Sequence, residues 1–290
     1  MESKNKVLLK TIYETDENLL KIFNHIRSLE KKSPYSTETL ENVIKNPIEL
    51  KQIFDNNGWN YNKIDYIIWG LPKTGNTSLY NAFSKINNGN LLFFHSIIEL
   101  LYKDLNFINY SEKDIIDFVE KNNPKVFVIV SYRNPFDNII SRIYHDIKVF
   151  ETNEIIDKII DKKDVIMHKF QIDYIYNQIF KEQFNIDFTN IKYNNELGFG
   201  LLNYSDKVSF VFTRLEDFSK FSKNVNKIIM FPPEFNFNIE CHNKNTDEKY
   251  ISSNHTFDSE FIDYIINSNQ FLLNYYNYDI QEIRNNLSLK

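Results

Sequence analysis

Four short and almost uninterrupted apolar runs limit the folds open to this chain more than any other feature. They occupy residues 64–69, 91–94, 126–130 and 208–212, and segments whose apolar residues have helical spacing separate them. Apolar strands that alternate with helices are typical of a parallel sheet covered on both faces, because neither side of such a strand suits solvent. We therefore predict a three-layer α/β fold with a parallel sheet flanked by helices. A fifth strand is expected at residues 228–231.

The N-terminal part of the chain differs from this pattern. Residues 1–60 are polar with helical spacing of their apolar residues, and Ser36 or Thr37 is placed to cap a helix that runs through Ile44. We expect a helical N-terminal extension over residues 1–60. One α/β domain is expected over residues 61–290, because no repeat or low-complexity linker divides that part.

Composition and charge narrow the classes of function. The 34 Lys+Arg against 39 Asp+Glu leave a net charge of −5, which disfavours general nucleic-acid binding because that role needs a basic face. Residues 1–20 contain no apolar stretch of the kind found in secretory signals, and no apolar run is long enough to span a membrane. The lone Cys241 has no partner for a disulfide within the chain. We expect a cytoplasmic protein without a transmembrane segment or a nucleic-acid partner.

A glycine-bearing loop follows the first apolar run. Residues 70–78 have the sequence GLPKTGNTS, and a helical pattern comes directly after them. A strand, a loop and a helix in this order aim backbone amides and a helix N-terminus at phosphate. Lys73 would add a mobile charge, and Thr77 and Ser78 would add hydroxyl donors. In a nucleotide-hydrolase P-loop a Lys directly follows the second glycine, whereas Asn76 holds that place here. A plain strand-to-helix turn is the alternative interpretation.

A second polar segment, which begins Tyr-Arg-Asn-Pro, follows the third apolar run. Arg133 lies at the exit of the predicted strand, Pro135 suits the first turn of a helix, and Ser141 falls two helical turns further on. The planar donor fork of an arginine and a serine hydroxyl can bind one anion from these places. The chain has only five arginines, so an arginine at this point is notable. The alternative is an ion pair of Arg133 with Asp137 or Asp146.

Together, these two segments resemble the cofactor-binding motifs of the PAPS-dependent sulfotransferase superfamily. Residues 70–79 are similar to the loop that binds the 5′-phosphosulfate, written P-K-[ST]-G-T-[ST], and residues 132–141 are similar to the 3′-phosphate motif, written Y-R-[ND]-P-x5-S. The resemblance implies a P-loop-type fold and 3′-phosphoadenosine 5′-phosphosulfate (PAPS) as the donor, with no metal. Asn76 departs from the pattern, which more commonly has Thr or Ser there.

The resemblance also implies roles for individual residues. The 5′-phosphosulfate would be bound by Pro72, Lys73, Thr74, Gly75, Asn76, Thr77 and Ser78. Lys73 would also act in catalysis by steadying the leaving phosphate, and Arg133 and Ser141 would select PAPS over ATP by binding the 3′-phosphate. A late polar segment, 242–250, looks like the loop that covers this phosphate in the family, which makes Lys244 and Lys249 candidates although the family's Arg-Lys-Gly form is absent.

His95 closes the second apolar run and is the candidate general base. A histidine can take the proton of an attacking hydroxyl near neutral pH, and cytosolic sulfotransferases place a catalytic histidine after a comparable strand. Glu99, one helical turn further on, is the alternative base, and a capping or core histidine is the structural alternative. Cys241, His242 and His255 have spacing unsuited to zinc, so we expect no metal site.

A further likeness points to the acceptor. Residues 213–218, with the sequence TRLEDF, resemble the R-x-E-D-[LF] segment of carbohydrate-type sulfotransferases. We expect this segment to have a structural role here, with Glu216 and Asp217 capping the next helix. A wider resemblance, over residues 64–221, is to the bacterial putative capsular polysaccharide synthesis family, which is itself sulfotransferase-like. It rests on residues 174–176, 180–187 and 214–217. This resemblance implies a sugar hydroxyl as the acceptor.

The sequence thus predicts an enzyme, a sulfotransferase that moves a sulfuryl group from PAPS to a hydroxyl of a glycan or a capsular polysaccharide precursor. One alternative is an ATP-dependent P-loop kinase. Against it stand the missing Gly-Lys-[ST] order and the lack of a clear Mg²⁺-binding Asp at a strand end. The other alternative, from a different class, is a non-catalytic nucleotide-binding protein with the same fold.

Overall fold

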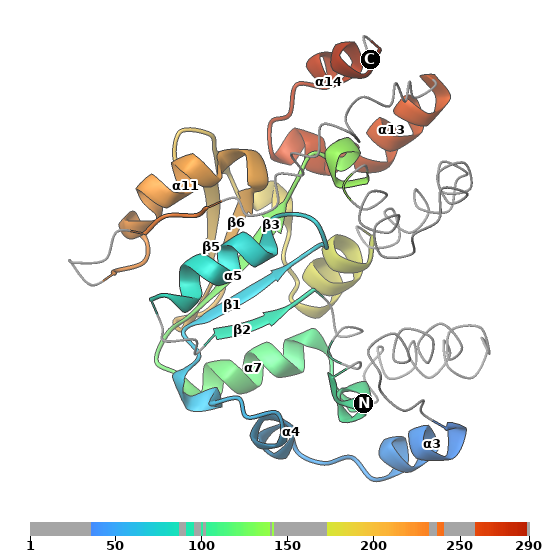
Figure 1. Ribbon diagram of the computed structural model, residues 1–290, viewed down its shortest axis with the longest axis vertical. Coiled ribbons are helices and arrows are strands. Elements are labelled where there is room, and N and C mark those ends of the chain that lie inside the picture. Colours follow the sequence, from blue (N-terminus) through green and yellow to red (C-terminus); the bar gives the residue numbers. More distant parts are fainter. Residues whose placement is uncertain are drawn as a thin grey trace.

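The structure, a computed structural model, has a six-stranded sheet with helices packed against it (Figure 1). It describes residues 36–86, 91–95, 100, 103–139, 141, 173–231, 237–240 and 259–288. The protein therefore belongs to the α/β class, as the alternation of apolar runs and helical segments predicted. In the described part of the chain, no helix is both long and apolar enough to cross a membrane.

Four parallel strands form the larger part of the sheet, and they coincide with the four predicted apolar runs. They are β1 (Tyr66–Gly70), β2 (Leu91–Phe94), β3 (Val126–Tyr132) and β6 (Val208–Arg214). The order across the sheet is β2-β1-β3-β6-β5-β4. Strands β5 (Phe199–Asn203) and β4 (Tyr193–Asn194) run antiparallel to their neighbours, so the sheet is mixed and not parallel throughout as predicted.

The fifth strand predicted at residues 228–231 is wrong. These residues follow a short 3-10 helix, η6 (Val225–Lys227), and belong to no strand. Ile229 is buried in a hydrophobic cluster with Phe83 and Phe221, whereas Met230 is 95% exposed. The run is apolar because part of it packs against the core as a turn, and a run this short does not distinguish that from a strand.

One face of the sheet is covered by α7 (Glu112–Asn122) and α4 (Leu50–Asn56). A capping box begins α7, in which the Ser111 hydroxyl accepts from the Asp114 N–H and the Asp114 carboxylate accepts from the Ser111 N–H. Phe54 of α4 is fully buried in the same hydrophobic cluster as the strands. Helix α4, which lies before the first strand, is therefore part of the main core.

The other face of the sheet is covered by α5 (Asn76–Ser84) and α11 (Phe218–Asn224). Figure 1 shows α5 and α7 on opposite sides of β1 and β2. Alternate residues of β1 enter the two clusters, with Ile68 on the α5 side and Trp69 on the α7 side. This alternation is a consequence of the pleat of a strand, and it determines which side chains lie on the α5 side, next to the loop after β1.

The remaining α-helices of the described part lie before and after the strands in the chain. Ser36 caps α3 (Thr37–Lys45) by accepting from the Thr39 N–H, which confirms the predicted cap. Near the C-terminus, the helices are α13 (Ser259–Tyr275) and α14 (Ile280–Ser288). The other elements are η1 (Tyr61–Lys63), η2 (Leu105–Asn109), the π-helix η3 (Asp173–Gln183), η4 (Phe188–Asn190) and η5 (Leu215–Asp217).

Candidate functional site

The parallel strands β2, β1 and β3 end side by side, and polar residues follow each of them. Gly70, the last residue of β1, pairs with Ser131 of β3, and the residue before Gly70 pairs with Phe94, the last residue of β2. His95 therefore follows β2 on one side of the glycine-bearing loop, and Arg133 follows β3 on the other. The sheet brings the three predicted segments to the carboxyl edge, where α/β proteins bind their ligands.

The loop between β1 and α5 turns through two residues in the left-handed region, Lys73 (φ 66°) and Gly75 (φ 86°). Position 75 requires glycine for a second reason, because a Cβ there would lie 2.6 Å from Cε2 of Phe218 and 2.7 Å from Cδ1 of Leu215. A non-glycine residue in this region costs roughly 1–2 kcal/mol, so Lys73 is strained. Such strain tends to occur at functional loops.

The helix α5 begins immediately after Gly75 without a side-chain cap. The N–H groups of its first three residues, Asn76, Thr77 and Ser78, therefore lack an acceptor within the helix. Thr77 is exposed and Ser78 is buried. Amides at a helix N-terminus without a helical acceptor favour an anion, and the phosphate site expected at this loop stays a prediction.

Two residues expected to bind the 5′-phosphosulfate, Thr74 and Asn76, turn their side chains into the protein. Thr74 is fully buried, and its hydroxyl lies 2.7 Å from the Leu71 carbonyl oxygen and 2.7 Å from Oγ of Ser131. Asn76 is 3% exposed, donates from Nδ2 to the carbonyls of Gly70 (3.1 Å) and Leu71 (2.8 Å), and accepts from the Ser131 hydroxyl. At these two positions, only the backbone N–H remains for a ligand.

Ser131 was missed among the predicted site residues, although it joins the loop to β3. The available signal was a hydroxyl residue at the end of the most apolar strand. Its place in the pleat, two residues after Ile129, puts it on the α5 side of the sheet. Gly70 makes room for it, because a Cβ on Gly70 would lie 2.9 Å from Oγ of Ser131 and 3.0 Å from Oδ1 of Asn76.

His95 lies on the same side of the sheet and is half-buried. Its Nδ1 is 2.8 Å from the Gly70 carbonyl oxygen and 2.9 Å from Nδ2 of Asn76. The ring of Phe93 stands edge-on to the imidazole, with 5.1 Å between the ring centroids. The candidate base is therefore in direct contact with residues that shape the glycine-bearing loop.

The segment after β3 contacts the loop from the opposite side. Nη1 of the half-buried Arg133 is 3.4 Å from the carbonyl oxygen of Lys73, and Nδ2 of Asn138 donates to the carbonyl oxygen of Pro72 at 2.8 Å. Asn138 is 2% exposed and was not predicted as a site residue. Among the described residues, Arg133 forms no ion pair with Asp137, so the first structural alternative for this arginine is not observed.

Not all predicted site residues fall within the described part of the chain. Ser141 is described, is helical and is partly buried. Residues that lie outside it are Glu99, Asp146, Cys241, His242, Lys244, Lys249 and His255.

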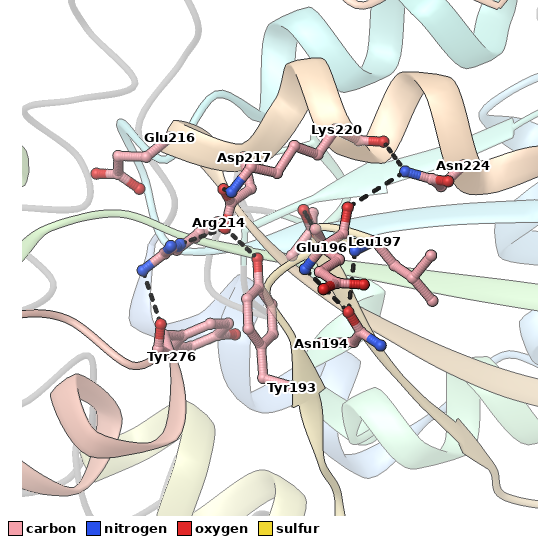
Figure 2. A network of polar contacts seen from close by, with 12 residues as sticks. Tyr193, Asn194, Glu196, Leu197, Arg214, Glu216, Asp217, Lys220, Asn224 and Tyr276 are labelled. Atoms are coloured by element: carbon pink, nitrogen blue, oxygen red, sulfur yellow. Dashed lines mark hydrogen bonds and ion pairs between the residues drawn. The ribbon is translucent and has the colours of Figure 1, made fainter.

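Arg214, at the end of β6, belongs to a separate polar network (Figure 2). Its Nε donates to the Asp217 carboxylate, its Nη1 donates to the Tyr276 carbonyl oxygen at 2.7 Å, and its guanidinium lies 4.8 Å from the centroid of the Tyr278 ring. Asp217 also accepts from the Tyr193 hydroxyl at 2.9 Å. These contacts assign Arg214 to the structural role that the sequence interpretation favoured.

The capping role expected for Asp217 is wrong. Asp217 precedes α11, but its side chain makes no capping hydrogen bond because its carboxylate is engaged by Arg214, Tyr193 and Lys220. Burial alone would raise the pKa of Asp217, but the hydrogen bonds from Arg214, Lys220 and Tyr193 outweigh burial and hold that pKa below its ordinary value. The carboxylate is therefore a charged component of the fold.

Glu216 extends this network to the candidate site. Its carboxylate accepts from the backbone N–H of Asn134 at 2.9 Å and from the Tyr278 hydroxyl at 2.7 Å. Asn134 directly follows Arg133, so the turn after β6 helps to hold the segment that carries this arginine.

Comparison of the chain with protein-family models, with curated proteins and with solved structures finds no match.

Proposed function

We propose that this protein is a sulfotransferase that uses PAPS and sulfates a hydroxyl, on a glycan or a capsular polysaccharide precursor. The proposal includes a three-layer, P-loop-type arrangement around the sheet. The observation that carries it is the meeting of Lys73, Arg133 and His95 at the carboxyl ends of three neighbouring parallel strands. A phosphate loop with an arginine on one side suits a donor with two separated phosphates, and a base on the other side suits an acceptor hydroxyl.

The loop supports the binding of the 5′-phosphosulfate. The uncapped backbone amides of residues 76–78 provide donors. Lys73, the strained residue just before Thr74 and Gly75, provides a positive charge. Arg133 supports the binding of the 3′-phosphate, because its guanidinium reaches the backbone of Lys73 and so stands beside the loop. Ser141 lies further along the same helical segment and would complete that phosphate site.

The proposed reaction is an in-line transfer. The acceptor hydroxyl oxygen forms a bond to sulfur, the bond between sulfur and the bridging phosphate oxygen breaks, and the hydroxyl proton passes to His95. Negative charge grows on the departing 5′-phosphate, where Lys73 and the loop amides stabilise it. A positioned base typically contributes roughly 10²–10⁴-fold to a rate, and one electrostatic donor roughly 10²–10³-fold.

Thermal stabilisation by nucleotides tests the donor. We expect 3′-phosphoadenosine 5′-phosphate, the product nucleotide, to raise the melting temperature, with a stabilisation of about 2.7 kcal/mol at a ligand concentration 100 times its Kd. ADP and ATP with Mg²⁺ should raise it far less. Stabilisation by MgATP and none by the bisphosphate would reject the proposal in favour of a kinase.

Substitutions test the individual roles. Arg133→Ala should weaken the bisphosphate more than adenosine 5′-phosphosulfate, whereas Lys207→Ala, at the opposite end of the sheet, should affect neither. His95→Ala should keep bisphosphate binding and lose transfer from radiolabelled PAPS to p-nitrophenyl glycosides, used as probe acceptors. Equal losses for both nucleotides in Arg133→Ala would contradict the 3′-phosphate role, and full turnover by His95→Ala would move the base to Glu99 or elsewhere. Nucleotide binding without any transfer would indicate the non-catalytic alternative.

A further inference from the structure

The turn that carries Arg133 is held by a carboxylate from another part of the chain. Oε1 of Glu216 accepts from the backbone N–H of Asn134 at 2.9 Å. This N–H belongs to the planar peptide group that joins Arg133 to Asn134, so the hydrogen bond restrains the backbone torsion ψ of Arg133. On the other side, Tyr132 is the last residue of β3 and pairs with Arg214 of β6. Both flanks of Arg133 are therefore held, which limits the rotamers open to its side chain.

Glu216 is itself oriented by the segment that follows α13. Its second oxygen, Oε2, accepts from the Tyr278 hydroxyl at 2.7 Å. The Tyr278 ring contacts the guanidinium of Arg214, 4.8 Å from the ring centroid, and the ring of Tyr132, with 6.1 Å between the centroids. An ionised carboxylate only accepts, and both of its partners are donors, so the direction of each hydrogen bond is settled. The turn that carries Arg133 is thus restrained by the C-terminal segment and by the turn after β6 together.

We propose that Glu216 is a positioning residue for Arg133 and thereby for recognition of the 3′-phosphate. The role of the arginine rests on the proposed function, whereas the hydrogen bond to Asn134 does not. Glu216 holds the peptide group after Arg133, and the guanidinium, whose Nη1 lies 3.4 Å from the Lys73 carbonyl oxygen, stays beside the glycine-bearing loop. An arginine whose backbone is already held loses less freedom when it binds an anion.

The sign of the charge distinguishes this role from a purely electrostatic one. Glu216 is negative and contacts the residue after an arginine that would bind phosphate, so by Coulomb's law alone its removal should strengthen the binding of an anion. A positioning role predicts weaker binding, because salt screens the like charge whereas the guanidinium loses its placement. A glutamine keeps an acceptor oxygen for the Asn134 N–H without the charge, so it should bind the bisphosphate at least as well as glutamate does.

The hydrogen bond is tested first, by NMR on the full chain without a ligand. Glu216 is exposed, so its variants should fold, which their melting temperatures check. An Arg-Asn pair occurs twice, at 133–134 and 284–285, so ¹³C-carbonyl arginine with ¹⁵N-asparagine gives two amide signals, of which Asn285→Gln removes the second. The Asn134 amide should exchange with deuterium roughly 10-fold faster in Glu216→Ala than in the wild type or in Glu216→Gln. Equal exchange in all three proteins would overturn the inference.

Nucleotide affinities from calorimetric titration test the positioning role. Glu216→Ala should bind 3′-phosphoadenosine 5′-phosphate roughly 10-fold more weakly than the wild type, and adenosine 5′-phosphosulfate, which lacks the 3′-phosphate, less than about two-fold more weakly. Glu216→Gln should restore the affinity for the bisphosphate. Tyr278→Phe, which removes the hydroxyl and keeps the ring, should act like Glu216→Ala but more weakly. Asp137→Asn is the matched control, because it removes an exposed carboxylate four residues after Arg133, and it should weaken neither nucleotide.

Several outcomes would refute the positioning role. Equal losses for the two nucleotides in Glu216→Ala would indicate a general effect on the fold, and tighter binding of the bisphosphate would indicate an electrostatic effect alone. An equal weakening in Asp137→Asn would refute the role as well. If the wild type binds no bisphosphate although the Asn134 amide behaves as expected, the proposed function fails and the positioning role fails with it, while the hydrogen bond between Glu216 and Asn134 stands.

Discussion

The substitution Asp217→Asn probes the buried network at the end of β6. The side chain of Asp217 is 3% exposed and that of Arg214 is 14% exposed, so neither charge is well solvated if the other is removed. Removing one partner of a buried ion pair typically costs roughly 3–5 kcal/mol. Asparagine keeps the shape and one acceptor oxygen, so we expect a loss of about 3 kcal/mol in the free energy of unfolding. For a chain of this size, that corresponds to a fall of roughly 6–12 °C in melting temperature.

Lys220→Met is the matched control, because Lys220 contacts the same carboxylate from outside. Its ammonium is 3.0 Å from Oδ1 of Asp217, but its side chain is 49% exposed, and such pairs contribute about 0–1 kcal/mol. Urea denaturation followed by far-UV circular dichroism gives both values, provided that the slopes of the transitions agree. The reasoning would be refuted if Asp217→Asn lost under about 1 kcal/mol, or if Lys220→Met lost as much as Asp217→Asn.

Three further predictions concern the pH dependence of stability, the loop glycine and its anchor. The pKa of Asp217 is lower in the folded protein than its unfolded value of about 3.9. The stability that Asp217 contributes is therefore fully present above the unfolded pKa and is lost as the pH falls through the folded pKa. The urea midpoint of the wild type should fall more steeply below about pH 4 than that of Asp217→Asn. Gly75→Ala should lower the free energy of unfolding by roughly 2–4 kcal/mol in thermal unfolding, because it adds a clash with Phe218 to backbone strain. Gly58→Ala, with a similar φ and nothing within 4 Å of its Cβ, should lower it by only about 1–2 kcal/mol. Equal losses would contradict the assigned clash. Asn138→Leu should leave the Pro72 carbonyl unpaired, cost about 1–3 kcal/mol and weaken the bisphosphate in calorimetric titration, and unaltered binding would mean that this anchor does not shape the loop.

Much of the sheet was predictable because apolar patterning is a local property. The four parallel strands lie where continuous apolar runs predicted them, since strands buried on both faces consist mainly of apolar residues. The antiparallel strand β5 was missed because Gly198 and Gly200 interrupt its apolar residues. Residues 228–231 were wrongly assigned to a strand for the converse reason, since a short apolar turn packed on a core has the same composition.

The candidate site was predictable in outline and not in its internal contacts. Lys73, His95 and Arg133 come after strands, and the carboxyl ends of parallel strands lie at one edge of the sheet, so the convergence of these residues could be expected from their order along the chain. Ser131 and Asn138 could not be selected in the same way. Their roles depend on which face of the sheet or helix they occupy and on which loop carbonyl lies opposite, and both are consequences of register.

The sequence by itself determined the α/β class, the positions of the four parallel strands and the polar residues that follow three of them, because these depend on local periodicity and chain order. Only the tertiary structure decided which side chains turn inward. Asn76 was predicted as a ligand contact, yet its amide is 3% exposed and bridges Gly70, Leu71 and Ser131 beside His95. That bridge joins residues 61 positions apart in the chain, from Gly70 to Ser131, and it exists only because two strands are in register and a glycine leaves space between them.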